Sequence, residues 1–343
     1  MKILLCPLNW GLGHATRCVP LIQNLLAEGH EVVLVADGYP LKFLKNQFPM
    51  LRTMEFPSYP VDYAAGKSQV GAMLRNLPGI VAGIIREHCW LGDLLRKEHF
   101  DRVISDNRFG MWNKRVNSVY ITHQLMVKMP RGLRFLEAFV HFLHLKIISN
   151  YDECWIPDRK ENGLSGDLSH QYPLPPNARF IGTLSRFQGL DGVVPADDYE
   201  IVAVLSGIES QRKILEEILI SKYKGKHQKV LIVCGHPDDE TRRLKIKNLT
   251  LVSHLADREL ASHLFGARKI IARSGYSTIM DLESLGCLHK AELIPTPGQT
   301  EQEYLAEIHK GYKEMVTGLS RIPTSPPQQN LLTSAKVRFT PRL

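Results

Sequence analysis

Short runs of apolar residues recur along the chain, separated by segments in which apolar positions follow helical spacing. Runs such as 31–37 (EVVLVAD) and 229–235 (KVLIVCG) are apolar almost throughout, which is typical of strands buried on both faces of a parallel sheet. The strands expected on this basis are 2–9, 31–37, 101–106, 118–124, 152–158 and 178–184 in the first half, and 200–207, 229–235, 249–255, 269–275 and 291–297 in the second. With helices between them, they predict an α/β fold.

The alternation stops at 185–199 (SRFQGLDGVVPADDY), a stretch rich in Gly, Asp and Pro that is typical of a linker. We therefore expect two doubly wound Rossmann-like domains facing each other across a cleft, at 1–186 and 187–316. The polar, Pro-rich tail at 317–343 is expected to be ordered only in part. Because ligands of such folds bind beyond the carboxyl ends of the strands, the functional residues are expected in the loops that follow the strands.

Charge narrows the class of partner. The chain of 343 residues carries a net charge of +8. Residues 1–186 hold 22 Lys and Arg against 16 Asp and Glu, and the remainder holds 21 against 19. The basic excess in the first half favours an anionic partner, such as a phosphorylated substrate or an anionic membrane surface. No run of five basic residues occurs, so nucleic acid is not expected as a partner.

Six scattered cysteines without a C-x-x-C pair indicate a reducing compartment and no structural zinc site. The apolar run at the start of the chain, MKILLCPLN, is shorter than the hydrophobic region of a signal peptide, and we expect it to form the first strand. No apolar run approaches the roughly 20 residues of a membrane span. We therefore expect a cytoplasmic protein. No D-x-D triplet or His/Cys cluster with metal spacing occurs, and so no metal and no cofactor is expected.

The loop after the first strand, 9–17 (NWGLGHATR), contains Gly11 and Gly13 in the manner of a dinucleotide fingerprint. Asp37 ends the second strand, where that fingerprint places its ribose-binding acid. The third glycine is missing, which disfavours a dinucleotide cofactor without removing it as an alternative.

The same loop suits the presentation of a catalytic histidine. Thr16 is expected to cap the following helix, with Pro20 near its first turn. The glycines would then leave His14 at the helix start, pointing into the cleft as a general base. The alternative is a histidine that only packs within the turn.

Two further strand ends in the first half carry polar side chains. Asp106 and Asn107 follow the strand at 101–106, and His123 ends the next strand with Gln124 beside it. An ionised Asp106 at the cleft would activate a hydroxyl or orient His14. An Asx-type turn is the alternative explanation for Asp106 and Asn107.

The most specific stretch of the second half is 272–286 (ARSGYSTIMDLESLG). A strand ends at Arg273, Ser274 and Gly275, and a helix is expected to open near Thr278. The free backbone N–H groups of such a helix start form an anion site suited to a diphosphate. Asp281, about one turn further on, offers a carboxylate for a ribose diol. Ordinary helix capping is the alternative.

The next strand is followed by 295–303 (PTPGQTEQE), where Glu301 and Gln302 offer acceptors that suit sugar hydroxyl groups. A capping box formed by Thr300 and Glu303 is the alternative explanation of this stretch.

These motifs together resemble the GT-B nucleotide-sugar glycosyltransferases. The Gly-x-Gly-His loop, the linker, RSGYSTIMDLESLG and PTPGQTEQEYLA are most similar to the MurG-type group of family 28. The resemblance spans roughly residues 1–310, although its motifs occupy only some forty positions.

The resemblance implies roles for particular residues. His14 matches the family's loop histidine, Arg186 a diphosphate-binding arginine, and Asp281 a ribose-binding glutamate that is here one methylene shorter. Ser210 falls in the family's phosphate loop, where Glu209 replaces a glycine. Glu301 and Gln302 align with two glutamines that bind the donor sugar in the family, and Glu301 replaces the first of them. His123 lies in a motif whose glutamate is absent here, and this puts its acceptor role in doubt.

The function that the resemblance implies is metal-independent, inverting transfer of a hexose or N-acetylhexosamine from a UDP-sugar to an acceptor hydroxyl. The resemblance implies a glycan or glycolipid as the acceptor and a UDP-sugar as the donor substrate. Two alternatives stay open: a UDP-N-acetylglucosamine epimerase-type enzyme, and a non-catalytic nucleotide-sugar-binding subunit.

Membrane contact is a separate expectation. The stretch 128–148 (KMPRGLRFLEAFVHFLHLKII) places four basic residues around a strongly apolar helix, which suits peripheral attachment to the inner face of an anionic membrane. A core helix whose basic ends reach solvent is the alternative.

Overall fold

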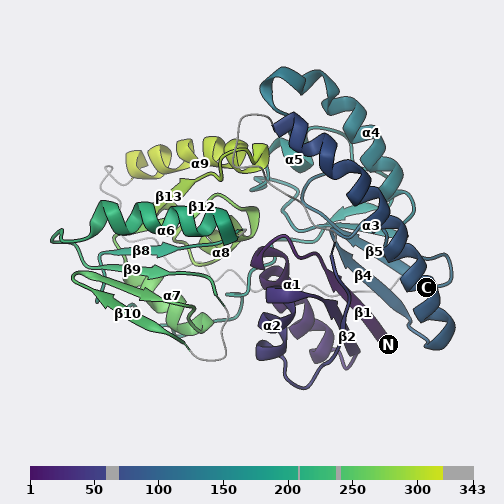
Figure 1. The fold of residues 1–343 in the computed structure, drawn as a ribbon, viewed down its shortest axis with the longest axis horizontal. Coiled ribbons are helices and arrows are strands. Elements are labelled where there is room, and N and C mark those ends of the chain that lie inside the picture. Colours follow the sequence, from purple (N-terminus) through teal and green to yellow (C-terminus); the bar gives the residue numbers. More distant parts are fainter. Residues whose placement is uncertain (59–68, 208, 237–240, 320–343) are drawn as a thin grey trace.

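Two sheets of mainly parallel strands, each covered by helices, make up the protein (Figure 1). The computed structural model describes residues 1–58, 69–207, 209–236 and 241–319. Between the last strand of the first sheet and the first strand of the second, residues 181–200 form neither helix nor strand. The predicted α/β class with two Rossmann-like units is confirmed.

The first sheet has seven parallel strands in the order β3-β2-β1-β4-β5-β6-β7. They are β1 (Lys2–Pro7), β2 (Glu31–Ala36), β3 (Arg52–Glu55), β4 (Arg102–Asp106), β5 (Asn117–Ile121), β6 (Glu153–Ile156) and β7 (Ala178–Phe180). The connecting helices are α1 (Leu12–Ala27), α2 (Gly38–Gln47), α3 (Gln69–Lys97), the 3-10 helix η1 (Arg131–Leu136), α4 (Glu137–Ile148) and the single turn α5 (Asp167–His170).

The second sheet has six strands in the order β10-β11-β9-β8-β12-β13, parallel except that β10 pairs antiparallel with β11. They are β8 (Ile201–Val204), β9 (Val230–Val233), β10 (Arg243–Ile246), β11 (Leu249–Val252), β12 (Lys269–Arg273) and β13 (Ala291–Ile294). The helices are α6 (Glu209–Tyr223), α7 (Asp257–Gly266), α8 (Tyr276–Ser284), the 3-10 helix η2 (Leu288–Lys290) and α9 (Thr300–Leu319).

The continuous apolar runs have a direct structural cause. Along β1, Ile3 and Leu5 lie in one buried cluster, whereas Leu4 and Cys6 lie in another. Successive side chains of a strand point to opposite faces, so both faces of this sheet are covered. The second sheet repeats the arrangement, with two buried clusters that divide its strand residues between them.

The order of strands reverses between β1 and β4 in the first sheet and between β8 and β12 in the second. Such a reversal opens a crevice at the carboxyl ends of the two central strands, because the connections leave in opposite directions. The loops after β1 and β12 therefore lie at these crevices, and they contain the motifs singled out above.

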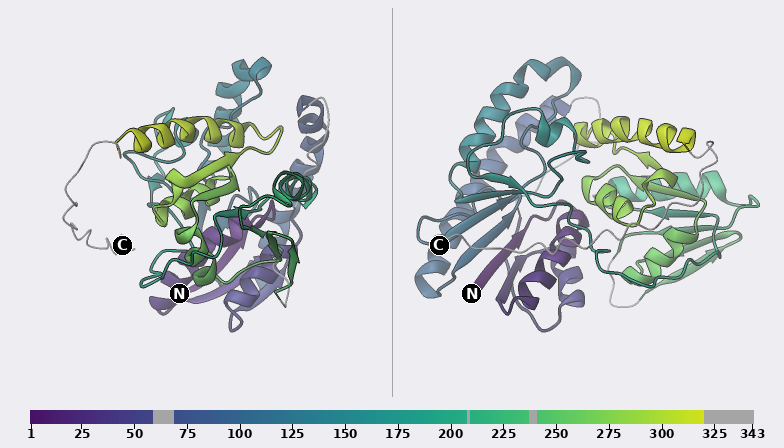
Figure 2. Two further views of the ribbon diagram at one scale, coloured as in Figure 1. Left: turned by 90° about the vertical axis from the view of Figure 1, so that its left-hand side faces the viewer. Right: turned by 180° about the vertical axis from the view of Figure 1, so that it is seen from behind.

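The domains meet where α1 and α8 begin. The Ser277 hydroxyl donates a hydrogen bond to the Gly13 carbonyl at 2.9 Å. A side chain at Gly11, whose φ is +108°, would lie 3.5 Å from the backbone of Gly207 in the other domain. The first turn of α9 also faces the N-terminal domain (Figure 2), where the Thr300 hydroxyl donates to the Lys128 carbonyl at 2.6 Å.

Two local expectations at the start of α1 were wrong. Helix α1 begins at Leu12, so Pro20 lies inside the helix and Thr16 does not cap it. The Thr16 hydroxyl instead donates back to the Gly13 carbonyl at 3.1 Å. Helix α9 continues to Leu319, three residues into the tail that was expected to be ordered in part, and the rest of that tail lies outside the described residues. Among the described helices none combines the length and hydrophobicity needed to cross a bilayer.

Candidate active site

A histidine–aspartate pair lies at the crevice of the first sheet. His14 Nδ1 is 3.2 Å from Asp106 Oδ1. The pair is brought together by the sheet itself, because β1 and β4 are parallel neighbours in which Pro7 is opposite Asp106. Asp106 is completely buried, and the His14 side chain is 13% exposed. The predicted association of these two residues is therefore present.

Arg17, one turn along α1 from His14, completes this pair into a buried charge cluster. Its Nε donates to Asp106 Oδ2 at 2.8 Å and its Nη2 donates to Asp106 Oδ1. The same Nη2 lies 2.9 Å from His14 Nδ1, and Nη1 lies 3.2 Å from His123 Nδ1. Arg17 is 2% exposed, so these contacts are shielded from water.

Burial and charge set the protonation of the pair. Burial alone would raise the pKa of Asp106, but the Arg17 guanidinium and His14 hold it well below its usual range. Burial lowers the pKa of His14, Arg17 lowers it further, and Asp106 opposes both. His14 is therefore uncharged near neutral pH, as a general base requires.

His123 extends the cluster across to the other domain. Its ring stacks on Tyr276, at the start of α8, with centroids 4.3 Å apart. His123 Nε2 lies 2.8 Å from Glu301 Oε1, and the Gln124 amide donates to Glu301 Oε2. Glu301, expected to contact the donor sugar, thus binds residues of the opposite domain.

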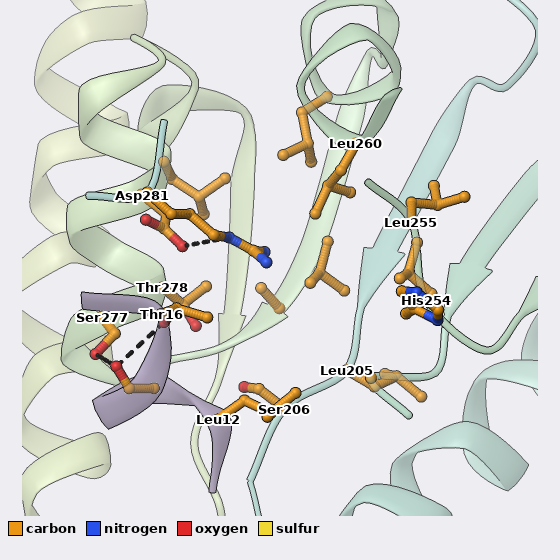
Figure 3. A pocket seen from close by; sticks show the side chains of 18 of the residues that line it. Leu12, Thr16, Leu205, Ser206, His254, Leu255, Leu260, Ser277, Thr278 and Asp281 are labelled. Carbon is orange, nitrogen blue, oxygen red and sulfur yellow. Dashed lines mark hydrogen bonds and ion pairs between the residues drawn. The ribbon is translucent and has the colours of Figure 1, made fainter. Parts of the chain in front are cut away.

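A cavity lies between the start of α1 and the C-terminal domain (Figure 3). Leu12, Gly13, Thr16 and Phe43 form the side contributed by the N-terminal domain. The other side carries Arg186, Ser206, His254, Leu255, Ser277, Thr278 and Asp281 among mainly apolar residues. His14 does not line this cavity, so the expectation that its side chain points into the shared cleft is not met there. Its buried contacts with Arg17 and Asp106 are the reason.

Asp281 and Arg186 lie together on the wall of the cavity. The Ser185 hydroxyl donates to Asp281 Oδ1 at 2.7 Å, and Arg186 Nε lies 3.4 Å from Asp281 Oδ2. Arg186 also pairs with Asp257 at 3.2 Å. Burial raises the pKa of Asp281 to about 6, although Arg186 and Ser185 counteract it. This carboxylate therefore titrates near the lower end of the physiological range.

Three other residues predicted to bind the sugar donor instead form hydrogen bonds within the C-terminal domain. Arg273 donates to the Pro295 and Gln211 carbonyls at 2.9 and 2.8 Å, and buried Ser274 donates to the Gln302 carbonyl at 2.7 Å. The Gln302 side chain accepts from the Thr296 N–H at 2.8 Å. None of these three residues lines the cavity of Figure 3.

The remaining predicted residues occupy varied positions. Gly275 is the N-cap of α8, so the helix starts close to where it was expected. Ser210 is exposed in the first turn of α6. Asn107 adopts a φ of +62° and its side-chain oxygen accepts from Tyr120 Oη at 2.9 Å. Asp37, relevant to the dinucleotide alternative, accepts from the Ser58 hydroxyl and backbone N–H.

Sequence reasoning missed Arg17 and His254. Arg17 follows His14 by three residues, a spacing that puts both on one face of a helix. It was overlooked because the helix was expected to begin later. His254 follows β11 and lines the cavity, so the strand-end rule would have found it. Within the described residues no group of three His, Cys, Asp or Glu side chains is arranged to hold a metal ion.

Comparison with known proteins supports this fold. No family model matches the chain. It is 24% identical over 351 residues to a protein of Methanosarcina acetivorans named an uncharacterized glycosyltransferase, covering 92% of this chain and 86% of that one. A Methanosarcina mazei protein of the same name is 22% identical with the same coverage.

Two solved structures show the same architecture. The spinosyn rhamnosyltransferase SpnG complexed with thymidine diphosphate superposes with a TM-score of 0.54 at 15% identity, covering 93% of this chain and 92% of that one. Arabidopsis thaliana UGT89C1 complexed with UDP-L-rhamnose gives 0.53 at 12% identity, with the same coverage. The fold is that of the GT-B glycosyltransferases. The resemblance is confirmed at that level, whereas its MurG-type subdivision stays a prediction.

Proposed function

We propose that this protein is an inverting, metal-independent glycosyltransferase that moves a hexose or N-acetylhexosamine from a UDP-sugar to an acceptor hydroxyl. The observation that carries the proposal is the His14–Asp106 pair next to Gly13, which lines the Asp281 cavity and accepts a hydrogen bond from Ser277 at the start of α8. Glycosyl transfer needs a general base, here His14 with Asp106 on one domain, and a site for the departing diphosphate, here the start of α8 on the other.

In this mechanism the nucleoside occupies the cavity of Figure 3, and its ribose hydroxyls donate to Asp281. The diphosphate lies toward the start of α8, where Gly275 and Thr278 supply free backbone N–H groups, with Arg186 as a cation nearby. The apolar wall around Leu255 and Leu260 suits the faces of a planar base.

His14 removes the proton of the acceptor hydroxyl, and the resulting oxygen attacks the anomeric carbon. The bond from that carbon to the diphosphate oxygen breaks at the same time, and UDP departs with the electron pair. Attack opposite the leaving group inverts the anomeric configuration. The start of α8 and the Arg186 guanidinium stabilise the departing diphosphate in place of a divalent ion.

The test is a panel of UDP-sugars, other nucleotide sugars and NAD(P), measured by thermal shift and by release of UDP with and without a membrane lipid extract. We expect UDP-sugars to raise the melting temperature, and UDP to be released only with the extract. Stabilisation by NAD(P) alone would overturn the proposal, and UDP release without any acceptor would favour the epimerase-type alternative.

The variant His14→Ala should abolish turnover while leaving UDP-sugar binding intact, because His14 lies outside the nucleotide cavity. His99→Ala is a matched control, since His99 is exposed, pairs with Asp101 and does not line that cavity. If turnover survives in His14→Ala, the assignment of the base is wrong.

We also propose that the acceptor is lipid-linked and that α4 attaches the enzyme to an anionic membrane. Phe135 is 77% exposed, and Phe139 and Phe142 are more than half exposed on the same segment. Lys146 lies 4.7 Å from the Phe142 ring and is itself exposed. Exposed aromatic rings with adjacent basic side chains suit the interface of an anionic bilayer.

Cosedimentation with vesicles of phosphatidylcholine and phosphatidylglycerol tests this attachment. The double variant Phe139→Ser/Phe142→Ser should lose binding, whereas Ile218→Ser, an equally exposed apolar position on α6, should not. Equal binding by wild type to neutral vesicles, or no binding at all, would contradict the membrane proposal but not the transferase activity.

A further inference from the structure

The guanidinium group of Arg17 contacts His14 and two of its polar neighbours, Asp106 and His123. It donates through Nε and Nη2 to the two oxygens of Asp106, and its remaining contacts are with the Nδ1 atoms of His14 and His123. An arginine side chain carries five N–H donors and has no acceptor. Both contacts with imidazole nitrogens are therefore hydrogen bonds only if each Nδ1 lacks a proton.

His123 supports this assignment independently. With Nδ1 accepting from Arg17, the proton of a neutral ring must lie on Nε2. That nitrogen is 2.8 Å from Glu301 Oε1, an oxygen that can only accept when the carboxylate is ionised. Burial raises the pKa of Glu301, but His123, His14 and Arg17 lower it overall, so it is ionised near neutral pH. The two contacts of His123 thus require the same tautomer.

For His14 two partners compete for the same nitrogen. Arg17 Nη2 lies 2.9 Å from Nδ1 and can only donate, whereas Asp106 Oδ1 lies 3.2 Å away and can only accept. The nearer partner is the arginine, and it also neutralises the carboxylate by its two-point contact. We infer that Arg17 is a positioning residue that holds His14 in the Nε2–H tautomer in the free enzyme.

This inference rests on the proposed function only for the role of His14 as the base. A ring with its proton on Nε2 cannot accept the hydroxyl proton at that atom. The proton must first be located on Nδ1, donating to Asp106, which leaves Nε2 with a free lone pair. Arg17 thereby sets the balance between a resting and a base-competent form of the same histidine.

The charged and titratable groups facing His14 come from four elements: Arg17 on α1, Asp106 on β4, His123 after β5, and Glu301 on α9. Removing only the Arg17 charge leaves Asp106 as an unneutralised anion beside Nδ1. The carboxylate then favours both Nδ1–H and the imidazolium. The pKa of His14 should rise by one unit or more, about the effect of an opposite charge within 4–6 Å.

Nitrogen NMR of protein labelled with ¹⁵N-histidine tests the inference without any substrate, because protonated and unprotonated ring nitrogens differ in chemical shift. His14→Gln identifies the His14 signals by their loss. We expect wild-type His14 to be the neutral Nε2–H tautomer at pH 7.5. Arg17→Met should move it to Nδ1–H and raise its pKa by about one unit or more.

Three variants separate charge from packing. Arg17→Lys keeps a cation beside Asp106, so the pKa of His14 should stay close to the wild-type value. The double variant Arg17→Met/Asp106→Asn removes both charges, so the pKa of His14 should again be low. Because it leaves no lone buried carboxylate, this variant can be measured even if Arg17→Met alone folds poorly. Arg108→Met, which breaks an equally buried arginine–glutamate pair of the same domain, should leave the His14 signals unchanged.

The inference is overturned if wild-type His14 is already Nδ1–H, or if Arg17→Met changes neither tautomer nor pKa. These outcomes are independent of the proposed function, because the NMR titration needs no donor or acceptor. Conversely, the proposed transferase activity would be contradicted if no UDP-sugar gave UDP release. If the NMR spectra still showed the expected tautomers, the role of Arg17 would stand.

Discussion

Donor binding should weaken in mild acid because of Asp281. Burial raises the pKa of this carboxylate to about 6, and its oxygens face Ser185 and Arg186 at the cavity wall. With a pKa of about 6, the ionised fraction is roughly 0.9 at pH 7 and roughly 0.1 at pH 5. If the ionised form alone accepts both ribose hydroxyls, affinity falls about tenfold between these values, or about 1.4 kcal/mol.

Isothermal titration calorimetry of UDP-glucose and UDP-N-acetylglucosamine from pH 5 to pH 8 measures this effect. UDP-sugars are better probes than UDP, because their diphosphate is a diester without an ionisation near pH 6. Asp281→Asn should bind more weakly at pH 7 and lose the pH dependence. Asp257→Asn, which removes the other carboxylate on Arg186 but does not line the cavity, should keep it.

Constant affinity for both sugars across this range would refute the assignment of Asp281 to the ribose. The same refutation follows if Asp281→Asn shows the wild-type pH dependence, since the titrating group would then be another one.

Three further predictions concern the scaffold. Glu87→Gln should lower the free energy of unfolding by about 3 kcal/mol in urea denaturation, because its arginine partner is then left buried and charged; an unchanged midpoint would show that the pair is dispensable. Gly266→Ala should lower the free energy of unfolding by about 1–3 kcal/mol, since a Cβ there would lie 1.6 Å from the Ala196 carbonyl oxygen. As a control, Gly79→Ala in α3 places its Cβ where no atom lies within 4 Å, and it should raise that free energy by about 0.5–1 kcal/mol. A thiol reagent should modify Cys89 rapidly in the native protein and all six cysteines in denaturant, because the other five are buried; several fast thiols would contradict the packing.

The central strands were predictable because burial on both faces leaves a continuous apolar run. Strands β3 and β10 were not, since each lies at a sheet edge and presents polar or exposed residues such as Arg52 and Lys245. Edge position alone is not the reason, because the edge strands β7 and β13 were both predicted; the polar residues of β3 and β10 remove the hydrophobic signal on which the prediction depends. The long helix α3 was likewise not singled out.

The association of His14 with Asp106 was predictable for a topological reason, because both follow strands at the carboxyl edge of one sheet. The contact between His123 and Glu301 was not, because it depends on how the two domains dock. Residues 178 positions apart carry no local signal of contact. The sequence placed Glu301 with the donor sugar, and the docking of the domains gives it partners on the acceptor side.

This separation along the chain has a consequence for synthesis. At typical translation rates of 5–20 residues per second, Glu301 emerges about 10–35 s after His123. His14, Arg17 and Asp106 are all present by then, and the first domain can fold around them. The hydrogen bond between His123 and Glu301 is thus the last part of the cluster to form. A chain that ends between the domains would carry the base but lack most of the nucleotide cavity, and such a fragment should be catalytically inactive.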